Sequence, residues 1–208
     1  MNRLCFAFVL TALASAAEFP PPATDIPAAA RKQTAVLAGG CFWGVEAVFE
    51  KLTGVSDVVS GFAGGSKSTA HYEVVSMGRT GHAESVRISY DPSQISYGRL
   101  LQIFFSIAHD PTQLNRQGPD QGTQYRSAIF YTTEEEKRVA EAYIQQLNQA
   151  KLFSRPIVTQ VVPLSGFYPA EDYHQNYIAR NPNDPYVVYN DLPKLKRLQK
   201  QYPDMVRP

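Results

Sequence analysis

Hydrophobic and polar positions change their period several times along the chain, which predicts strands that alternate with helices. Apolar residues at every second position of 83–90 are typical of a strand, and apolar residues spaced by three and four over 42–52 are typical of a helix. The same reasoning predicts further strands at 34–39, 55–62, 127–131 and 157–164 and further helices at 97–108, 134–150, 171–179 and 194–202. This order predicts one α+β domain over 34–208, built as a two-layer sandwich.

Two local patterns refine these elements. Thr133 followed by Glu136 matches a capping box at the start of the helix predicted over 134–150. The segment 109–125 is rich in Asp, Pro, Gln, Gly and Asn, although it lies between two elements with a clear apolar period. Loops of this length inside a compact domain are usually functional or disordered, so this loop is a candidate to carry site residues.

The N-terminus has the pattern of a secretory signal peptide. Arg3 precedes an apolar stretch, and Ala14-Ser15-Ala16 supplies the small residues that signal peptidase accepts. We predict a signal peptide at 1–16, a proline-rich flexible linker at 17–33, and export to the periplasm or the medium. An uncleaved N-terminal anchor is the alternative, although the apolar stretch is short for a membrane span.

Cleavage there would change both the charge and the cysteine count. The 20 Lys and Arg residues would lose Arg3 and equal the 19 acidic residues, so neither a nucleic acid nor an anionic membrane is an expected partner. Of the two cysteines, Cys5 would be removed, and Cys41 could then form no intramolecular disulfide. A lone thiol in an exported protein is either reactive or half of an intermolecular bridge.

Cys41 lies where a predicted strand gives way to a predicted helix, between Gly40 and Phe42. The first turn of a helix leaves backbone N–H groups free and carries the positive end of the helix dipole, and both favour an anion. We therefore predict a reactive cysteine whose thiol pKa is below its ordinary value of about 8.5. A buried structural cysteine at a strand-to-helix turn is the alternative.

The histidines show no spacing typical of metal ligands; they are His71, His82, His109 and His174. We predict no metal site and no cofactor. We expect His82 and His174 to support loops through hydrogen bonds.

Several short motifs occur in the order in which one known family has them. They are Gly40-Cys41-Phe42-Trp43-Gly44, Gly61-Phe62-Ala63-Gly64-Gly65, Tyr72-Glu73-Val74-Val75, Gly81-His82-Ala83-Glu84, His109-Asp110-Pro111-Thr112-Gln113, 120–127 and Tyr173-His174-Gln175. With these motifs the chain resembles peptide methionine sulfoxide reductase A over roughly 34–190. The resemblance implies an α+β sandwich with a ferredoxin-like core. It also implies reduction of the S epimer of methionine sulfoxide, free or in proteins, to methionine.

The resemblance further implies roles for individual residues. Cys41 corresponds to the nucleophile that attacks the sulfoxide sulfur, and Glu84 corresponds to the acid that protonates the sulfoxide oxygen. Tyr72 and Tyr125 correspond to phenols that hydrogen-bond this oxygen. Asp120 corresponds to a carboxylate that helps to position the site.

The chemistry itself requires such an acid, because a sulfoxide oxygen leaves only when it is protonated or strongly hydrogen-bonded. Glu84 must then keep its proton near neutral pH, which requires burial or an anionic neighbour to raise its pKa from about 4.3. Phe42 and Trp43 correspond in the family to rings that hold the substrate methyl group. A rigid aromatic face suits such a group.

The chain departs from the family in its cysteines. Many members carry further cysteines near the C-terminus that resolve the sulfenic acid, whereas 194–208 contains none and Ser76 stands where relatives often have one. We therefore expect a one-cysteine member that is recycled by an external thiol, namely thioredoxin, glutaredoxin or glutathione. We also predict a monomer. Phe62 and Pro119 replace a common Tyr and a common Asn, and neither belongs to the proposed proton-transfer groups.

Two other functions remain open on the sequence alone. Cys41 could pair with His82, His109 or His174 in a cysteine-dependent acyl transferase, which requires an imidazole within hydrogen-bond reach of the sulfur. The chain could instead be an exported thiol-binding or redox-sensing module without turnover.

Overall fold

The structure, a computed structural model, describes residues 19–28 and 31–207, so the predicted signal peptide lies outside the described residues. The helices are α1 (Phe42–Glu50), α2 (Tyr72–Val75), α3 (Tyr97–Ile103), α4 (Glu134–Gln149), α5 (Tyr177–Arg180) and α6 (Leu192–Gln201). The strands are β1 (Gln33–Gly39), β2 (Val55–Ala63), β3 (Ala83–Tyr90), β4 (Arg116–Gln117), β5 (Asp120–Gln121), β6 (Ser127–Tyr131), β7 (Gln160–Pro163) and β8 (Phe167–Pro169).

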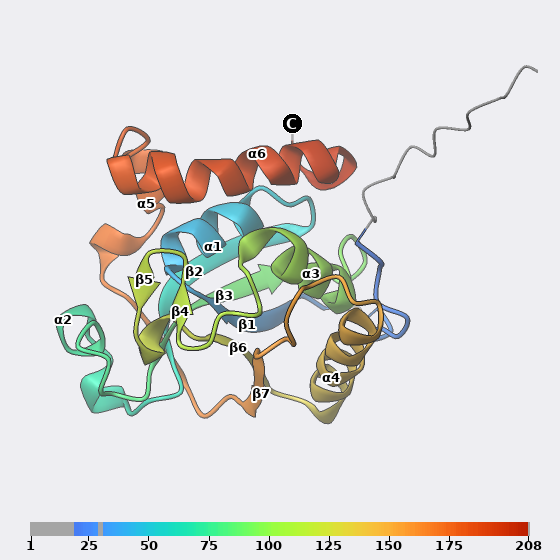
Figure 1. The fold of residues 1–208 in the computed structure, drawn as a ribbon, viewed down its shortest axis with the longest axis horizontal. Helices are drawn as coiled ribbons and strands as arrows, with labels where there is room; N and C mark the ends of the chain where they lie inside the picture. The colour runs from blue at the N-terminus through green and yellow to red at the C-terminus, as the bar shows by residue number, and fades with distance from the viewer. Residues whose placement is uncertain (1–18, 29–30, 208) are drawn as a thin grey trace, which may run out of the picture.

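Six strands form one mostly antiparallel sheet in the order β7-β6-β1-β3-β2-β8 (Figure 1). The pair β6–β7 is parallel, and β4 and β5 form a separate hairpin. Leu37 of β1 pairs with Val86 of β3, and both belong to the main core. Val36 and Ala38 belong to a second apolar cluster, because successive side chains of a strand point to opposite faces. Strand β1 is therefore buried on both faces, which explains its continuous apolar run.

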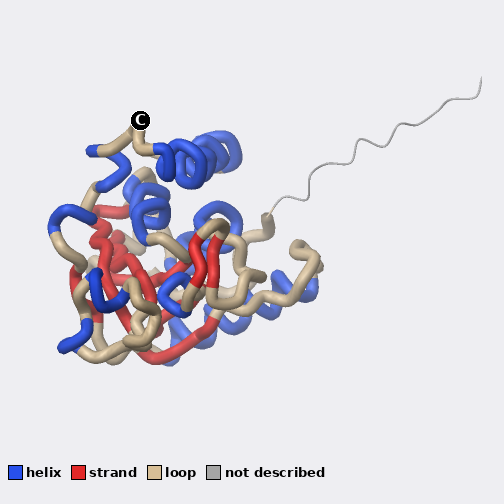
Figure 2. Tube along the Cα trace, turned by 60° about the vertical axis from the view of Figure 1, so that its left-hand side comes forward, coloured by secondary structure: helices blue, strands red, loops and turns tan. Residues whose placement is uncertain are grey.

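The helices supply the other side of the main core. Phe49 of α1, Leu101 of α3 and Val139 of α4 are buried there together. Helix α6 lies over α1 (Figure 1), and its Leu198 reaches the same core. Figure 2 shows most strands gathered in the middle of the domain with helices around them. The predicted α+β class is confirmed, and α6 adds a further tier outside α1. Within the described part of the chain, no helix is long and apolar enough to cross a membrane.

The structure alters several predicted elements. The helix expected over 97–108 is α-helical only to Ile103 and continues as a π-helical turn, η2 (Phe104–Ala108). The helix expected over 171–179 is interrupted, because Asn176 has a left-handed backbone with a φ of 53°. The polar loop 109–125 contains β4 and β5. The capping box is present, since Thr133 accepts from the Glu136 amide and the Glu136 side chain accepts from the Thr133 amide.

The N-terminal arm, residues 19–28, is held along the domain. The Tyr143 hydroxyl donates to the Pro20 carbonyl at 2.7 Å, and Asp25 accepts from the Gly98 amide at 2.8 Å. Apolar side chains of the arm also pack against the main core. Within the segment predicted as a flexible linker (17–33), residues 19–28 thus make polar and apolar contacts with the domain, and burial of apolar surface and satisfied backbone groups offset the entropy of ordering.

Candidate active site

Cys41 lies at the turn from β1 into α1, where the sequence predicts it. Gly40 makes this turn with a φ of 93°, and a Cβ on Gly40 would lie 2.5 Å from the Gln117 side chain. Cys41 is the N-cap residue of α1 and is only 8% exposed. The turn therefore places the thiol at the positive end of α1, and neighbouring residues cover it from solvent.

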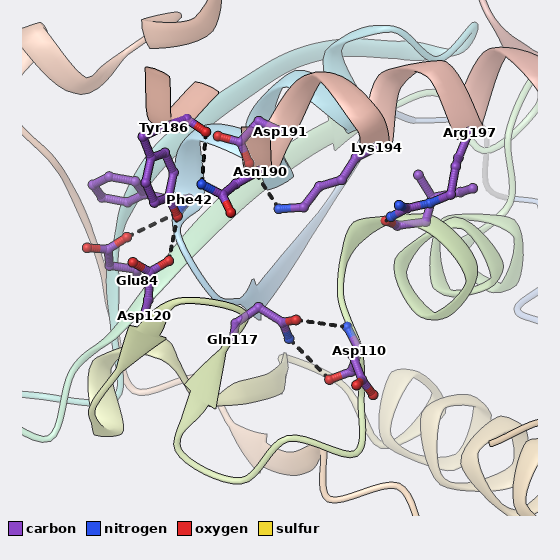
Figure 3. A network of polar contacts seen from close by, with 11 residues as sticks. Phe42, Glu84, Asp110, Gln117, Asp120, Tyr186, Asn190, Asp191, Lys194 and Arg197 are labelled. Atoms are coloured by element: carbon purple, nitrogen blue, oxygen red, sulfur yellow. Dashed lines mark hydrogen bonds and ion pairs between the residues drawn. The ribbon is translucent and has the colours of Figure 1, made fainter. Parts of the chain in front are cut away.

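Glu84 reaches the same end of α1 from the start of β3. Its Oε2 accepts a hydrogen bond from the Phe42 backbone N–H at 3.1 Å (Figure 3), and the residue is 2% exposed. Burial, assisted by the charge of Asp120 and opposed by the Phe42 N–H, raises the pKa of Glu84 to about 8. Glu84 therefore carries a proton at neutral pH and can act as an acid beside Cys41.

Two phenols and a carboxylate from separate segments complete the group. Burial, with the nearby charges of Glu84 and Cys41, raises the pKa of Tyr72 to about 12. Burial and Glu84 likewise raise the pKa of Tyr125, and Asp120 interacts with both phenols. The structure thus brings together the five residues expected to be catalytic. Both phenols keep their hydrogen at neutral pH and can donate it to a bound oxygen.

An aromatic wall, made of Phe42, Trp43, His174 and Tyr177, lies beside these groups. The Phe42 ring lies 5.0 Å from the His174 ring, and the Trp43 ring stacks on Tyr177 at 3.7 Å with 7° between the planes. The Trp43 Nε1–H donates to His174 Nδ1 at 3.1 Å. Phe42 is buried and Trp43 is half-buried, because adjacent helical residues point in different directions.

The Cys41 thiol does not have the low pKa that its helix position predicts. Burial raises its pKa well above the ordinary value, and Glu84 and Asp191 raise it further, whereas the Trp43 backbone and Lys194 lower it. The helix N-terminus acts in the predicted direction, but desolvation outweighs it. The prediction was wrong because a sequence pattern does not show how deeply the thiol is covered.

In the described part of the chain, no imidazole hydrogen-bonds to Cys41. Each buried histidine has another partner: backbone groups of a glycine-rich loop for His82, a carbonyl of η2 for His109, and the Trp43 indole for His174. His82 supports a loop through hydrogen bonds as expected, whereas His174 accepts a hydrogen bond from the indole ring of Trp43. The acyl-transferase alternative therefore lacks its base. Within the same residues, no group of three or more His, Cys, Asp or Glu is placed to hold a metal ion.

The family to which the chain belongs follows from comparison with known protein families. Residues 33–205 match the family model described as peptide methionine sulfoxide reductase. The chain belongs to the peptide methionine sulfoxide reductase family. It is therefore an oxidoreductase that acts on sulfur and reduces methionine sulfoxide in a thiol-dependent reaction.

Individual relatives place this reductase in the A class of the family. The peptide methionine sulfoxide reductase MsrA 2 of Synechocystis sp. is 56% identical over 90% of this chain and 90% of its own. MsrA 2 of Mesorhizobium japonicum is 57% identical over 86% of this chain and 92% of its own. The solved structure of Mxr1 from Saccharomyces cerevisiae in reduced form has a TM-score of 0.67 and 34% identity, and it covers 77% of this chain and 90% of that one. The solved structure of methionine sulfoxide reductase A of Corynebacterium diphtheriae has a TM-score of 0.64 and 37% identity, and it covers 74% of this chain and 77% of that one. The recognition drawn from the motifs is confirmed.

The structure adds residues to the reductase site that sequence reasoning missed. The Tyr186 hydroxyl donates to Asp120 Oδ2 at 2.5 Å, and Asp191 with Lys194 lies close by (Figure 3). Tyr186, Asp191 and Lys194 belong to no recognised motif, and the sequence places Lys194 only at the start of the helix predicted over 194–202. They reach the site because α6 and the segment before it pack against α1. A sequence pattern does not indicate contacts between segments so far apart.

Proposed function

We propose that this reductase acts on the S epimer of methionine sulfoxide, free or within proteins, with Cys41 as the nucleophile. The observation that supports this proposal is a buried Glu84 that is protonated at neutral pH and lies beside Cys41. A carboxylic acid flanked by two phenols suits a reaction in which negative charge builds on an oxygen. The aromatic wall offers an apolar surface to the S-methyl group.

In the first half of the proposed cycle, the Cys41 sulfur attacks the sulfoxide sulfur. Glu84 gives its proton to the sulfoxide oxygen, while Tyr72 and Tyr125 donate hydrogen bonds to it. The oxygen then passes from the substrate sulfur to the Cys41 sulfur. The bond between the two sulfurs and the sulfur–oxygen bond of the substrate break, a bond between the oxygen and the Cys41 sulfur forms, methionine leaves, and Cys41 becomes a sulfenic acid. The proton of the Cys41 thiol restores Glu84. One thiol and one sulfoxide thus give one sulfenic acid and one thioether.

An external thiol completes the proposed cycle. Cys41 is the one cysteine in the described residues, and Cys5 precedes the proposed signal cleavage site. A first reductant thiol attacks the sulfenic acid, which releases water and leaves a mixed disulfide between Cys41 and the reductant. A second reductant thiol then attacks this mixed disulfide, which restores the Cys41 thiol and leaves the reductant as a disulfide. Thioredoxin, glutaredoxin or glutathione supplies these thiols. The signal-like N-terminus supports export of the enzyme, which acts as a monomer.

The core of the proposed fold is ferredoxin-like. The strand order β6-β1-β3-β2, antiparallel throughout, supports this assignment, because β1, α1, β2, β3, α3 and β6 follow one another as two interlocked β-α-β units. In this arrangement the C-terminal end of β1, where the chain turns into α1, and the N-terminal end of the antiparallel strand β3 lie at the same end of the sheet. Cys41 and Glu84 occupy those two positions.

The proposed substrate is tested with dabsyl-methionine sulfoxide, supplied as separate S and R epimers with dithiothreitol as reductant. The S epimer is expected to be reduced, and the R epimer to react at least about a hundredfold more slowly, because its oxygen would point away from Glu84. Reduction of the R epimer alone would contradict the proposal. Absence of turnover on both would favour a thiol-binding module.

Replacement of either phenol is expected to slow the chemical step. Tyr72→Phe and Tyr125→Phe each remove one donor to the developing oxygen charge, so kcat should fall about 10- to 100-fold with a smaller change in KM. Steady-state kinetics on the S epimer measure both constants. Tyr189→Phe, at an exposed tyrosine, is the matched control and should leave both unchanged. A change in KM alone would show that the phenols bind substrate without stabilising the transition state.

A further inference from the structure

Asp191 and Lys194 form a buried ion pair directly against the first turn of α1. Lys194 Nζ donates to Asp191 Oδ1 at 3.0 Å (Figure 3), and the two side chains are 13% and 0% exposed. A Cβ on Gly44 would lie 2.1 Å from Asp191 Oδ1 and 2.7 Å from Lys194 Nζ. Gly44 is three residues beyond Cys41, so the pair lies beside the helix end that carries the thiol.

The surroundings of this pair indicate more than a contribution to stability. A buried ion pair costs desolvation free energy and is a weak source of stability. Lys196 and Lys200 of the same helix are exposed, whereas Lys194 turns its ammonium inward. Asp191 Oδ2 is buried and has no hydrogen-bond partner among the described residues, although such oxygens are normally satisfied.

The position of the ammonium is also unusual for a lysine. The N-terminus of α1 already carries the positive end of a helix dipole, which repels a cation. Asp191 is the anion that holds Lys194 there, and it accepts from one of three ammonium hydrogens. An anion formed on Cys41 would meet two positive features at once.

We propose that Lys194 and Asp191 set the fraction of Cys41 that is ionised, the ammonium favouring the thiolate and the carboxylate opposing it while holding the ammonium in place. The inference rests on the proposed function, since it concerns the nucleophile of that reaction. The charges act in the expected directions: Lys194 lowers the pKa of Cys41 and Asp191 raises it.

Other ionisable groups face Cys41 from several elements. They are Glu84 of β3, Tyr72 of α2, Tyr125 of η3 (Thr123–Tyr125), Tyr177 of α5 and Tyr186 before α6. Each of them is neutral or anionic near neutral pH. Among the groups named here as acting on the Cys41 thiol, Lys194 is the cation, and it is therefore the group that can stabilise a thiolate.

The test is the rate at which iodoacetamide alkylates Cys41 in the full chain, between about pH 7 and pH 10. The tryptic peptide over 33–51 contains no other cysteine, so its mass follows Cys41 alone. Only the thiolate reacts. Lys194→Met is expected to slow alkylation about tenfold at a given pH, and Asp191→Asn is expected to accelerate it by a similar factor. Lys196→Met, on the exposed side of α6, is the control and should match wild type.

The double variant Asp191→Asn/Lys194→Met should fall between the two single variants. Changes of the same sign in both single variants, or no change in either, would overturn the proposal. Circular dichroism and thermal unfolding check that each variant is folded. If Asp191→Asn does not fold, Lys194→Met against Lys196→Met decides the question. Alkylation does not require methionine sulfoxide, so failure of this charge effect and failure of the proposed function give different results.

Discussion

Cys41→Ser is expected to abolish reduction of methionine sulfoxide. A serine hydroxyl is a much weaker nucleophile than a thiol, and no imidazole in the described residues hydrogen-bonds to this position to activate it. The value of kcat/KM for the S epimer should fall at least about a thousandfold. The assay is reduction of the separated S epimer with dithiothreitol, on variants whose thermal unfolding matches wild type.

The wild-type enzyme should also show a limited burst when no reductant is present. Each chain is expected to release one methionine and then stop with Cys41 as a sulfenic acid, which dimedone traps and mass spectrometry locates on the peptide over 33–51. Cys5→Ser is the matched control and should give the same burst. Several methionines per chain without added thiol would mean that the chain resolves its own sulfenic acid, contrary to the proposed cycle.

Glu84→Gln is expected to have the second large effect. The amide oxygen can still accept from the Phe42 N–H, but the side chain has no acidic proton, so kcat should fall about 100- to 1,000-fold at neutral pH. The pKa of Glu84 is about 8, so the wild-type rate should fall as pH rises through that value. The Gln variant should lack this decline, and the ratio of the wild-type kcat to the variant kcat should be largest below about pH 8. Profiles of kcat between about pH 6 and pH 10 make the comparison. A decline at the same pH in the variant would show that another group is the acid.

The same substitution should stabilise the fold at alkaline pH. Glu84 has a pKa of about 8 in the folded chain and an ordinary pKa of about 4.3, so between these values the folded state keeps a proton that the unfolded state has lost. Stability from this group is therefore full below the ordinary value and falls as pH rises toward the folded value. Above it, wild type buries an anion and the Gln variant does not. At about pH 9 the Tm of Glu84→Gln should be several degrees higher than that of wild type. A lower Tm would show that burial is not the main cause of the raised pKa.

Periodicity was sufficient for the elements with long apolar patterns. The strand over 83–90 and the helix that begins after Thr133 are where their patterns predict them. Short elements have too few residues to show a period, so α2 and β8 were not predicted. Asn176, where the expected helix is interrupted, has a left-handed backbone, and its backbone N–H donates to Glu46 Oε2 of α1 at 3.0 Å. A sequence pattern does not indicate this contact, because the two residues lie far apart in the chain.

The sequence by itself determined the identity of the chemistry, because the motifs around Cys41, Glu84, Tyr72 and Tyr125 place a thiol, an acid and two phenols in a known order. It also determined that Cys41 begins a helix. Only the tertiary structure decided the protonation states, because desolvation depends on what covers a group: burial reverses the helix effect on the Cys41 thiol and keeps Glu84 protonated. The structure alone also decided that Lys194 belongs to the site, because α6 meets α1 only when the chain is folded.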